Sequence, residues 1–111
     1  MINDRIEVVL NEKKYNARLD FLALANTQWY LESEKGKFFT VPNIMKGLSE
    51  DNLTVIGALL IESILRCHPQ LSREVIYENM KFNELNIIRE AIGELIKASL
   101  PQDDDDKKKD E

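Results

Sequence analysis

The apolar positions in the first twenty residues predict a β-hairpin. Two short runs, RIEVVL and YNARL, place apolar residues at every second position, and the polar stretch NEKK separates them. A period of two is typical of a strand that buries one face. We therefore expect a hairpin over about residues 5–19. It must pack on helices, because an isolated hairpin is only marginally stable.

From residue 21 onwards the spacing of apolar residues changes and predicts helices. Steps of three and four residues between apolar side chains indicate one buried helix face. Asp20 and Gly36 are placed to begin and end the first helix, and Ser49 and Ser72 are placed to cap two later ones. The expected helices cover about residues 21–35, 42–48, 51–67, 72–80 and 83–100.

Together these elements predict a mostly α fold. We expect one small globular domain over residues 1–100, with four to five helices and an N-terminal β-hairpin. The segment 53–65 is apolar on nearly all sides, so it should lie at the centre or meet a partner. Residues 101–111, PQDDDDKKKDE, predict a disordered charged tail because they have no apolar residues to bury.

Length and composition fit a single soluble domain. The chain has 111 residues, of which 43% are hydrophobic and 32% are charged. No apolar run reaches the roughly 20 residues that cross a bilayer, so no membrane partner is expected. The N-terminal stretch MINDRIEVVLNEKK lacks the continuous apolar core of a signal peptide. We therefore expect a cytoplasmic protein.

The sequence contains no arrangement typical of an active site. EKGKFF has one glycine and lacks the spacing of a phosphate-binding loop. Cys67 and His68 are neighbours in a predicted helix, where adjacent side chains point about 100° apart and do not form a nucleophile–base pair. They also provide only two of the four ligands of a structural zinc site. We expect no enzyme, metal, cofactor or small-molecule substrate.

The charge pattern argues against a nucleic-acid partner. The net charge is −5, and the last nine residues, with six acids and three lysines, account for −3 of it. The segment LSREVIYENMKFNELNIIREAI could form a helix-turn-helix. Its second helix offers Asn83, Asn86 and Arg89 to base edges, but its glutamates would repel phosphates. A small DNA-binding regulator is therefore the less favoured interpretation.

Two pairs of adjacent aromatic residues are the best candidates for a binding surface. The members of each pair point in different directions, so at least one of each pair is expected near the surface. Exposed aromatic side chains are enriched in protein interfaces. The apolar helix at 53–65 is also a candidate, because one of its faces could meet a partner. The candidate partner-binding residues are Trp29, Tyr30, Phe38, Phe39, Ile56 and Leu60.

The order of these segments resembles the tail assembly chaperones of long-tailed, siphovirus-type phages and prophages of Gram-positive bacteria. The resemblance covers about residues 1–100 and is carried by LNEKKYNARLD, ALANTQWYLE, LSEDNLTVIGALLIESIL and LSREVIYENM, followed by an amphipathic last helix. It implies a protein that is no enzyme and that binds the helical tape measure protein during tail building. Such a chaperone keeps that protein soluble and helps recruit the tail tube protein. The resemblance implies an apolar groove for the tape measure helix, which we expect between the helix at 53–65 and the aromatic residues at 29–39.

The resemblance also implies where such a protein acts. It would work in the cytoplasm of the infected or lysogenic bacterial host and be absent from the mature virion. Several copies are needed for each tape measure protein, so self-association is expected. The alternative interpretation is a small structural protein of the phage head–tail connector or neck.

The C-terminal stretch DDDDKKKDE has three interpretations. It is a solubilising tail by composition. DDDDK is also an enterokinase recognition sequence, which would make it an engineered addition. The resemblance adds ribosomal frameshifting: Lys107, Lys108 and Lys109 would mark an A-rich slip site from which a longer form of the protein is made. The codons of these lysines distinguish the third interpretation from the others.

Overall fold

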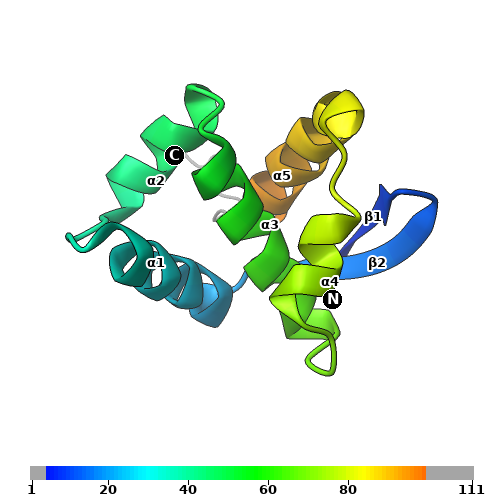
Figure 1. Ribbon diagram of the computed structural model, residues 1–111, viewed down its shortest axis with the longest axis horizontal. Helices are drawn as coiled ribbons and strands as arrows, with labels where there is room; N and C mark the ends of the chain where they lie inside the picture. Colours follow the sequence, from blue (N-terminus) through cyan, green and yellow to red (C-terminus); the bar gives the residue numbers. More distant parts are fainter. Residues whose placement is uncertain (1–4, 100–111) are drawn as a thin grey trace, which may run out of the picture.

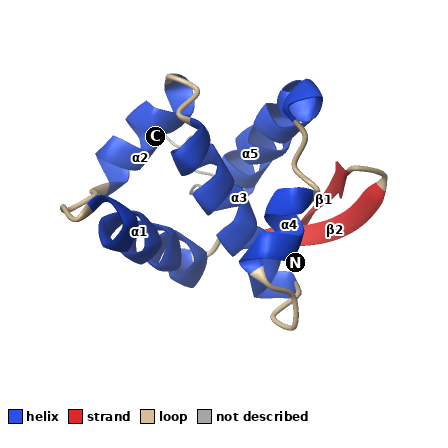
Figure 2. Cartoon of the chain, viewed as in Figure 1, coloured by secondary structure: helices blue, strands red, loops and turns tan. Residues whose placement is uncertain are grey.

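In the computed structural model, one helix lies at the centre and the other elements surround it (Figure 1). The structure describes residues 5–99. Its elements are β1 (Arg5–Leu10), β2 (Lys13–Arg18), α1 (Phe21–Lys35), α2 (Val41–Ser49), α3 (Leu53–Cys67), α4 (Arg73–Glu78), the 3-10 helix η1 (Phe82–Glu84) and α5 (Leu85–Ser99). The prediction of a mostly helical fold with an N-terminal hairpin is confirmed (Figure 2). The predicted tail at 101–111 lies outside the described residues.

The hairpin turns through two residues, Asn11 and Glu12, and so is tighter than the NEKK reversal suggested. Their φ angles are 52° and 67°. Left-handed residues at both positions match the twist of paired strands, and asparagine tolerates this conformation well. The backbone N–H of Asn11 donates to Glu84 Oε1 at 3.0 Å, and its side chain donates to Asn79 Oδ1 at 3.1 Å. These bonds fasten the turn to the connection between α4 and α5.

α3 is the core of the molecule. Residues 55–64 are all buried, because α1, α2, α4, α5 and strand β2 pack around this helix. The prediction that an apolar helix would lie at the centre is therefore confirmed. The larger core cluster joins α3 to the hairpin, α4 and α5, and a smaller cluster joins it to α1 and α2.

Most of the predicted helix caps are present. Asp20 Oδ1 accepts the Ala23 N–H at 2.8 Å at the start of α1, Gly36 ends that helix with a φ of 70°, and Ser72 caps α4. The predicted cap at Ser49 is wrong. Ser49 is the last residue of α2, and the side chain of Asn52 caps α3 instead, after a three-residue turn.

Gly47 allows α2 to pack closely on α3. A Cβ at this position would lie 2.8 Å from Cγ2 of Val55 and 3.0 Å from its Cβ. Val55 is fully buried, so it has no room to move aside. The glycine in this short helix is thus explained by the approach of the two helices.

Candidate functional site

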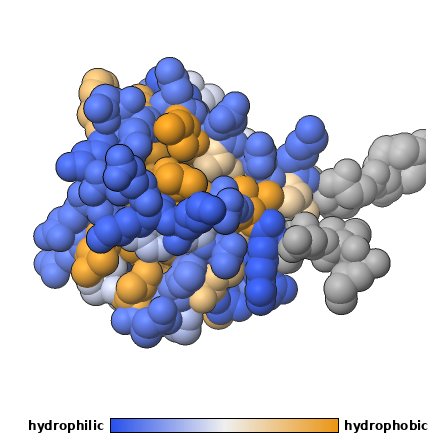
Figure 3. Space-filling view, turned by 90° about the vertical axis from the view of Figure 1, so that its right-hand side faces the viewer, coloured by the Kyte–Doolittle hydropathy of each residue, from blue (hydrophilic) through white to orange (hydrophobic). Residues whose placement is uncertain are grey.

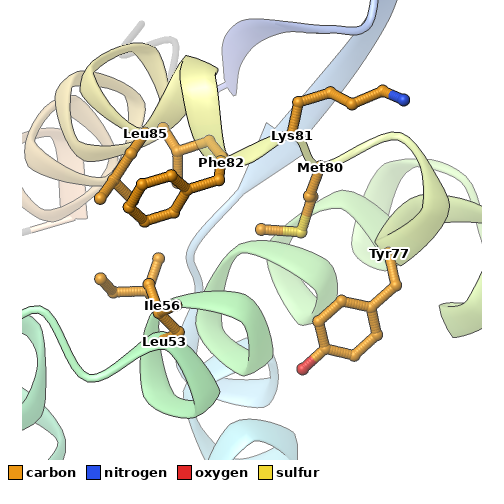
Figure 4. A pocket seen from close by; sticks show the side chains of 8 residues that line it. Leu53, Ile56, Tyr77, Met80, Lys81, Phe82 and Leu85 are labelled. Carbon is orange, nitrogen blue, oxygen red and sulfur yellow. The ribbon is translucent and has the colours of Figure 1, made fainter.

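An apolar hollow of about 180 Å³ opens between α3, α4, η1 and α5. It is lined by Leu53, Ile56, Tyr77, Met80, Lys81, Phe82, Leu85 and Ile88. Figure 4 shows Phe82 and Leu85 facing Leu53 and Ile56 across the hollow, while the ammonium group of Lys81 points away from it. An interior of this kind suits an apolar side chain better than a polar ligand.

The mouth of the hollow exposes large apolar side chains. Phe82 is 77% exposed and Leu53 is 53% exposed. Figure 3 shows apolar residues reaching the surface between polar ones on the side of the molecule that carries the hairpin and α5. Removing apolar surface from water is favourable by about 25 cal/mol per Å². A partner that covered this mouth would gain that free energy.

One wall of the hollow depends on a glycine. The ring of Tyr77 lies so close to Gly57 of α3 that a Cβ there would be 2.9 Å from the ring. Burial raises the pKa of the Tyr77 phenol above its usual value; the neighbouring Tyr30 raises it further, and Arg73 opposes the shift. Tyr77 is therefore neutral at physiological pH and keeps this wall uncharged.

A polar cluster holds α4 against α1 and α3. The guanidinium group of Arg73, on α4, forms an ion pair with Glu62 of α3, whose side chain is only 4% exposed. The same group stacks on the ring of Tyr30, 4.1 Å from its centroid. Within residues 5–99, Nη1 of Arg73 is buried and has no hydrogen-bond acceptor. The cluster fixes the start of α4, and the same helix carries Tyr77.

A second hollow, of about 330 Å³, lies between α2, α3 and α5. Ile56 lines both hollows, so the two hollows adjoin at this residue. Arg89 lines the second one and binds Asp51 with two hydrogen bonds of 2.8 Å. These bonds raise the pKa of Arg89 and lower that of Asp51. Arg89 also donates to Asn86, so it is engaged within the chain and is not free to read a base.

Each of the two aromatic pairs has one exposed and one partly buried member, as expected for adjacent residues. Trp29 is 67% exposed and Phe38 is 87% exposed, whereas Tyr30 and Phe39 are partly buried. The prediction that one member of each pair reaches the surface is confirmed. Tyr30 and Phe39 pack against the same small core cluster between α1, α2 and α3, and Tyr30 also contacts Arg73 of α4.

The remaining predicted residues require a correction. Leu60 is fully buried in the larger core cluster and offers no surface to a partner, so its assignment to an open groove is wrong. Ile56 is also buried and reaches only the floor of the hollows. The reason is that elements pack on every side of α3, including the side that the sequence left open for a partner.

Sequence reasoning missed the residues that shape the mouth of the first hollow. The apolar pattern places Leu53 in the core helix and Phe82 in the connection between two helices. The signal was present in the stretch NMKFNEL, where Met80 and Phe82 place large apolar side chains in a short polar link. Apolar residues in such a link either cover a core or lie at the surface, and Phe82, which is 77% exposed, lies at the surface.

The cysteine and histidine have structural positions. Cys67 is the last residue of α3 and is partly buried. The Nε2 atom of His68 accepts the backbone N–H of Asn16 at 3.0 Å, and its ring packs edge-on to Tyr15. His68 thus joins the end of α3 to the hairpin. No group of three or more potential metal ligands lies together within residues 5–99.

No helix in the part of the chain that the structure describes has the length and apolar character needed to cross a membrane. No protein-family model, curated protein or solved structure matches this chain. The candidate site is therefore defined by its geometry: an uncharged hollow with exposed apolar residues at its mouth.

Proposed function

We propose that this protein is a phage tail assembly chaperone that binds the tape measure protein, keeps it soluble and helps recruit tail tube subunits. The observation that carries the proposal is the apolar hollow with Leu53 and Phe82 at its mouth. An amphipathic helix can place an apolar side chain in such a hollow while its neighbours one turn away cover the rim. Because the order of segments resembles that of tail assembly chaperones, we assign this helix to the tape measure protein.

The proposal extends to assembly and location. The exposed side chains of Trp29 and Phe38 lie apart from the hollow and are available for contacts between copies along the tape measure protein. The chaperone acts in the host cytoplasm and does not remain in the finished virion. A longer form made by frameshifting at Lys107–109 belongs to the same proposal, and the codons at that position test it.

Changing the mouth of the hollow is expected to weaken binding to the tape measure protein. Leu53→Ser and Phe82→Ser each remove an exposed apolar side chain, so neither change opens a core cavity. Truncating a central apolar contact typically costs more than 1 kcal/mol, and we expect about tenfold weaker binding for each variant. The measurement is the affinity for helical fragments of the tape measure protein encoded in the same genome.

Two further variants serve as controls for this measurement. Val75→Ser removes an exposed apolar residue of α4 that does not line the hollow, and it should bind like the unchanged protein. Trp29→Ser tests the surface of α1. Full binding by both hollow variants together with loss in Trp29→Ser would contradict the proposed site and move it to α1.

A further inference from the structure

β1 has an open edge. The register pairs Leu10 with Lys13 around a two-residue loop, so Leu10, Val8 and Ile6 exchange hydrogen bonds with β2. The alternate residues Glu7 and Val9 therefore direct their backbone N–H and C=O groups away from β2. Within residues 5–99 these groups make no hydrogen bond. Such an edge is a template on which another strand can pair.

The other edge of the hairpin is covered. β2 packs against α3, and the outward N–H of Asn16 donates to Nε2 of His68 at 3.0 Å. The outward N–H of Asn16 is therefore occupied, whereas the outward N–H groups of Glu7 and Val9 are not, so strand addition is favoured beside β1.

A hollow of about 170 Å³ runs along the free edge. Four consecutive residues of β1, from Ile6 to Val9, line one wall, and α5 provides the other. Consecutive strand residues point to opposite faces, so a space that touches all four lies beside the edge of the strand and not on one face. The wall from α5 consists of Ile87, Glu90, Ala91 and Glu94.

The charge of this groove selects its occupant. Glu7, Glu90 and Glu94 line it, and none of the three forms an ion pair with another residue in the range 5–99. Ile87 and Ala91 form an apolar strip between the carboxylates. A lysine side chain suits this wall, because its methylene stem packs on apolar atoms while its ammonium group reaches a carboxylate. A second copy would bring two sets of carboxylates together and be repelled.

We propose that the groove between β1 and α5 binds an extended, basic segment of a partner protein as an added strand. Backbone hydrogen bonds to Glu7 and Val9 hold the segment, and the three carboxylates select lysine or arginine at alternate positions. This surface is separate from the apolar hollow, so the inference does not depend on the proposed function.

The test uses a labelled synthetic peptide, Lys-Val-Lys-Val-Lys-Val-Thr-Val, which carries lysine at alternate positions, and the full chain. Val9→Pro removes an outward N–H without touching a bond to β2, and proline is tolerated at strand edges. Glu90→Gln combined with Glu94→Gln removes charge from an exposed helix face. We expect each change to weaken binding about tenfold, as loss of one hydrogen bond or charge contact predicts. In the unchanged protein, the peptide should slow amide exchange at Glu7 and Val9.

Two peptides act as controls. Replacing the lysines by glutamates should abolish binding, and so should replacing valine and threonine by alanine, which keeps the charge but favours a helix. Equal binding of the alanine peptide, or unchanged exchange at Glu7 and Val9, would overturn the proposal. So would a dimer of the chain that Val9→Pro dissociates, because the edge would then belong to a second copy.

Discussion

Replacing Arg73 by methionine is expected to destabilise the protein by about 3 kcal/mol, the lower end of what breaking a buried ion pair costs. The change leaves the Glu62 carboxylate buried without its partner. It also removes the guanidinium group from the ring of Tyr30. Chemical denaturation at neutral pH measures the loss as a lower midpoint with an unchanged slope.

A double variant separates the missing partner from the missing packing. In Glu62→Leu/Arg73→Met both charges are gone and apolar groups of similar size remain, so stability should return to near that of the unchanged protein. If the double variant is as unstable as Arg73→Met, the loss comes from packing and the account of the ion pair is wrong. Because α4 carries Tyr77, Arg73→Met should also weaken binding at the hollow.

Asp20→Ala is expected to lower the free energy of unfolding by about 2–3 kcal/mol, because the carboxylate has two separate roles. It caps α1 by accepting the Ala23 N–H, and it accepts three hydrogen bonds of 2.8–3.0 Å from Arg66 at the end of α3. Asp20→Asn keeps a good cap and loses the charge. The free energy of unfolding of Asp20→Asn should therefore lie between that of the unchanged protein and that of Asp20→Ala. If Asp20→Asn is as stable as the unchanged protein, the role of Arg66 is contradicted.

The lowered pKa of Asp20 predicts that the stability of the protein depends on pH. The hydrogen bonds from Arg66 hold the pKa of Asp20 below its usual value, partly offset by burial. Its stabilising contribution is therefore complete above the unfolded-state pKa of about 3.9 and is lost as pH falls through the lower folded-state pKa. Unfolding free energies measured between pH 7 and pH 2 should fall less steeply at the acid end for Asp20→Asn.

The sequence was sufficient to predict most of the elements. Alternation in RIEVVL, the cap at Asp20 and the glycine at position 36 are local signals, and the structure confirms each of them. The cap at Ser49 failed because α2 extends through Ser49, and the side chain of Asn52, three residues later, accepts the first N–H groups of α3. Local patterns alone do not distinguish such neighbours.

The candidate site was less accessible to sequence reasoning. Exposure of Trp29 and Phe38 followed from adjacency, since neighbouring residues cannot all face one core. Burial of Leu60 depends on α4 and α5 covering α3, which is a tertiary contact without a local signal. The hollow arises from contacts of the same kind, because Phe82 of η1 and Leu85 of α5 lie across from Leu53 and Ile56 of α3.

We propose that this chain protects the apolar surface of the tape measure protein through the hollow. The most direct test of this proposal is the fraction of that protein that stays soluble when the two are produced together. We expect the tape measure protein to be soluble with the unchanged chain or with Val75→Ser, and to aggregate with Leu53→Ser/Phe82→Ser or in the absence of this chain. Equal solubility with the double hollow variant would contradict the account.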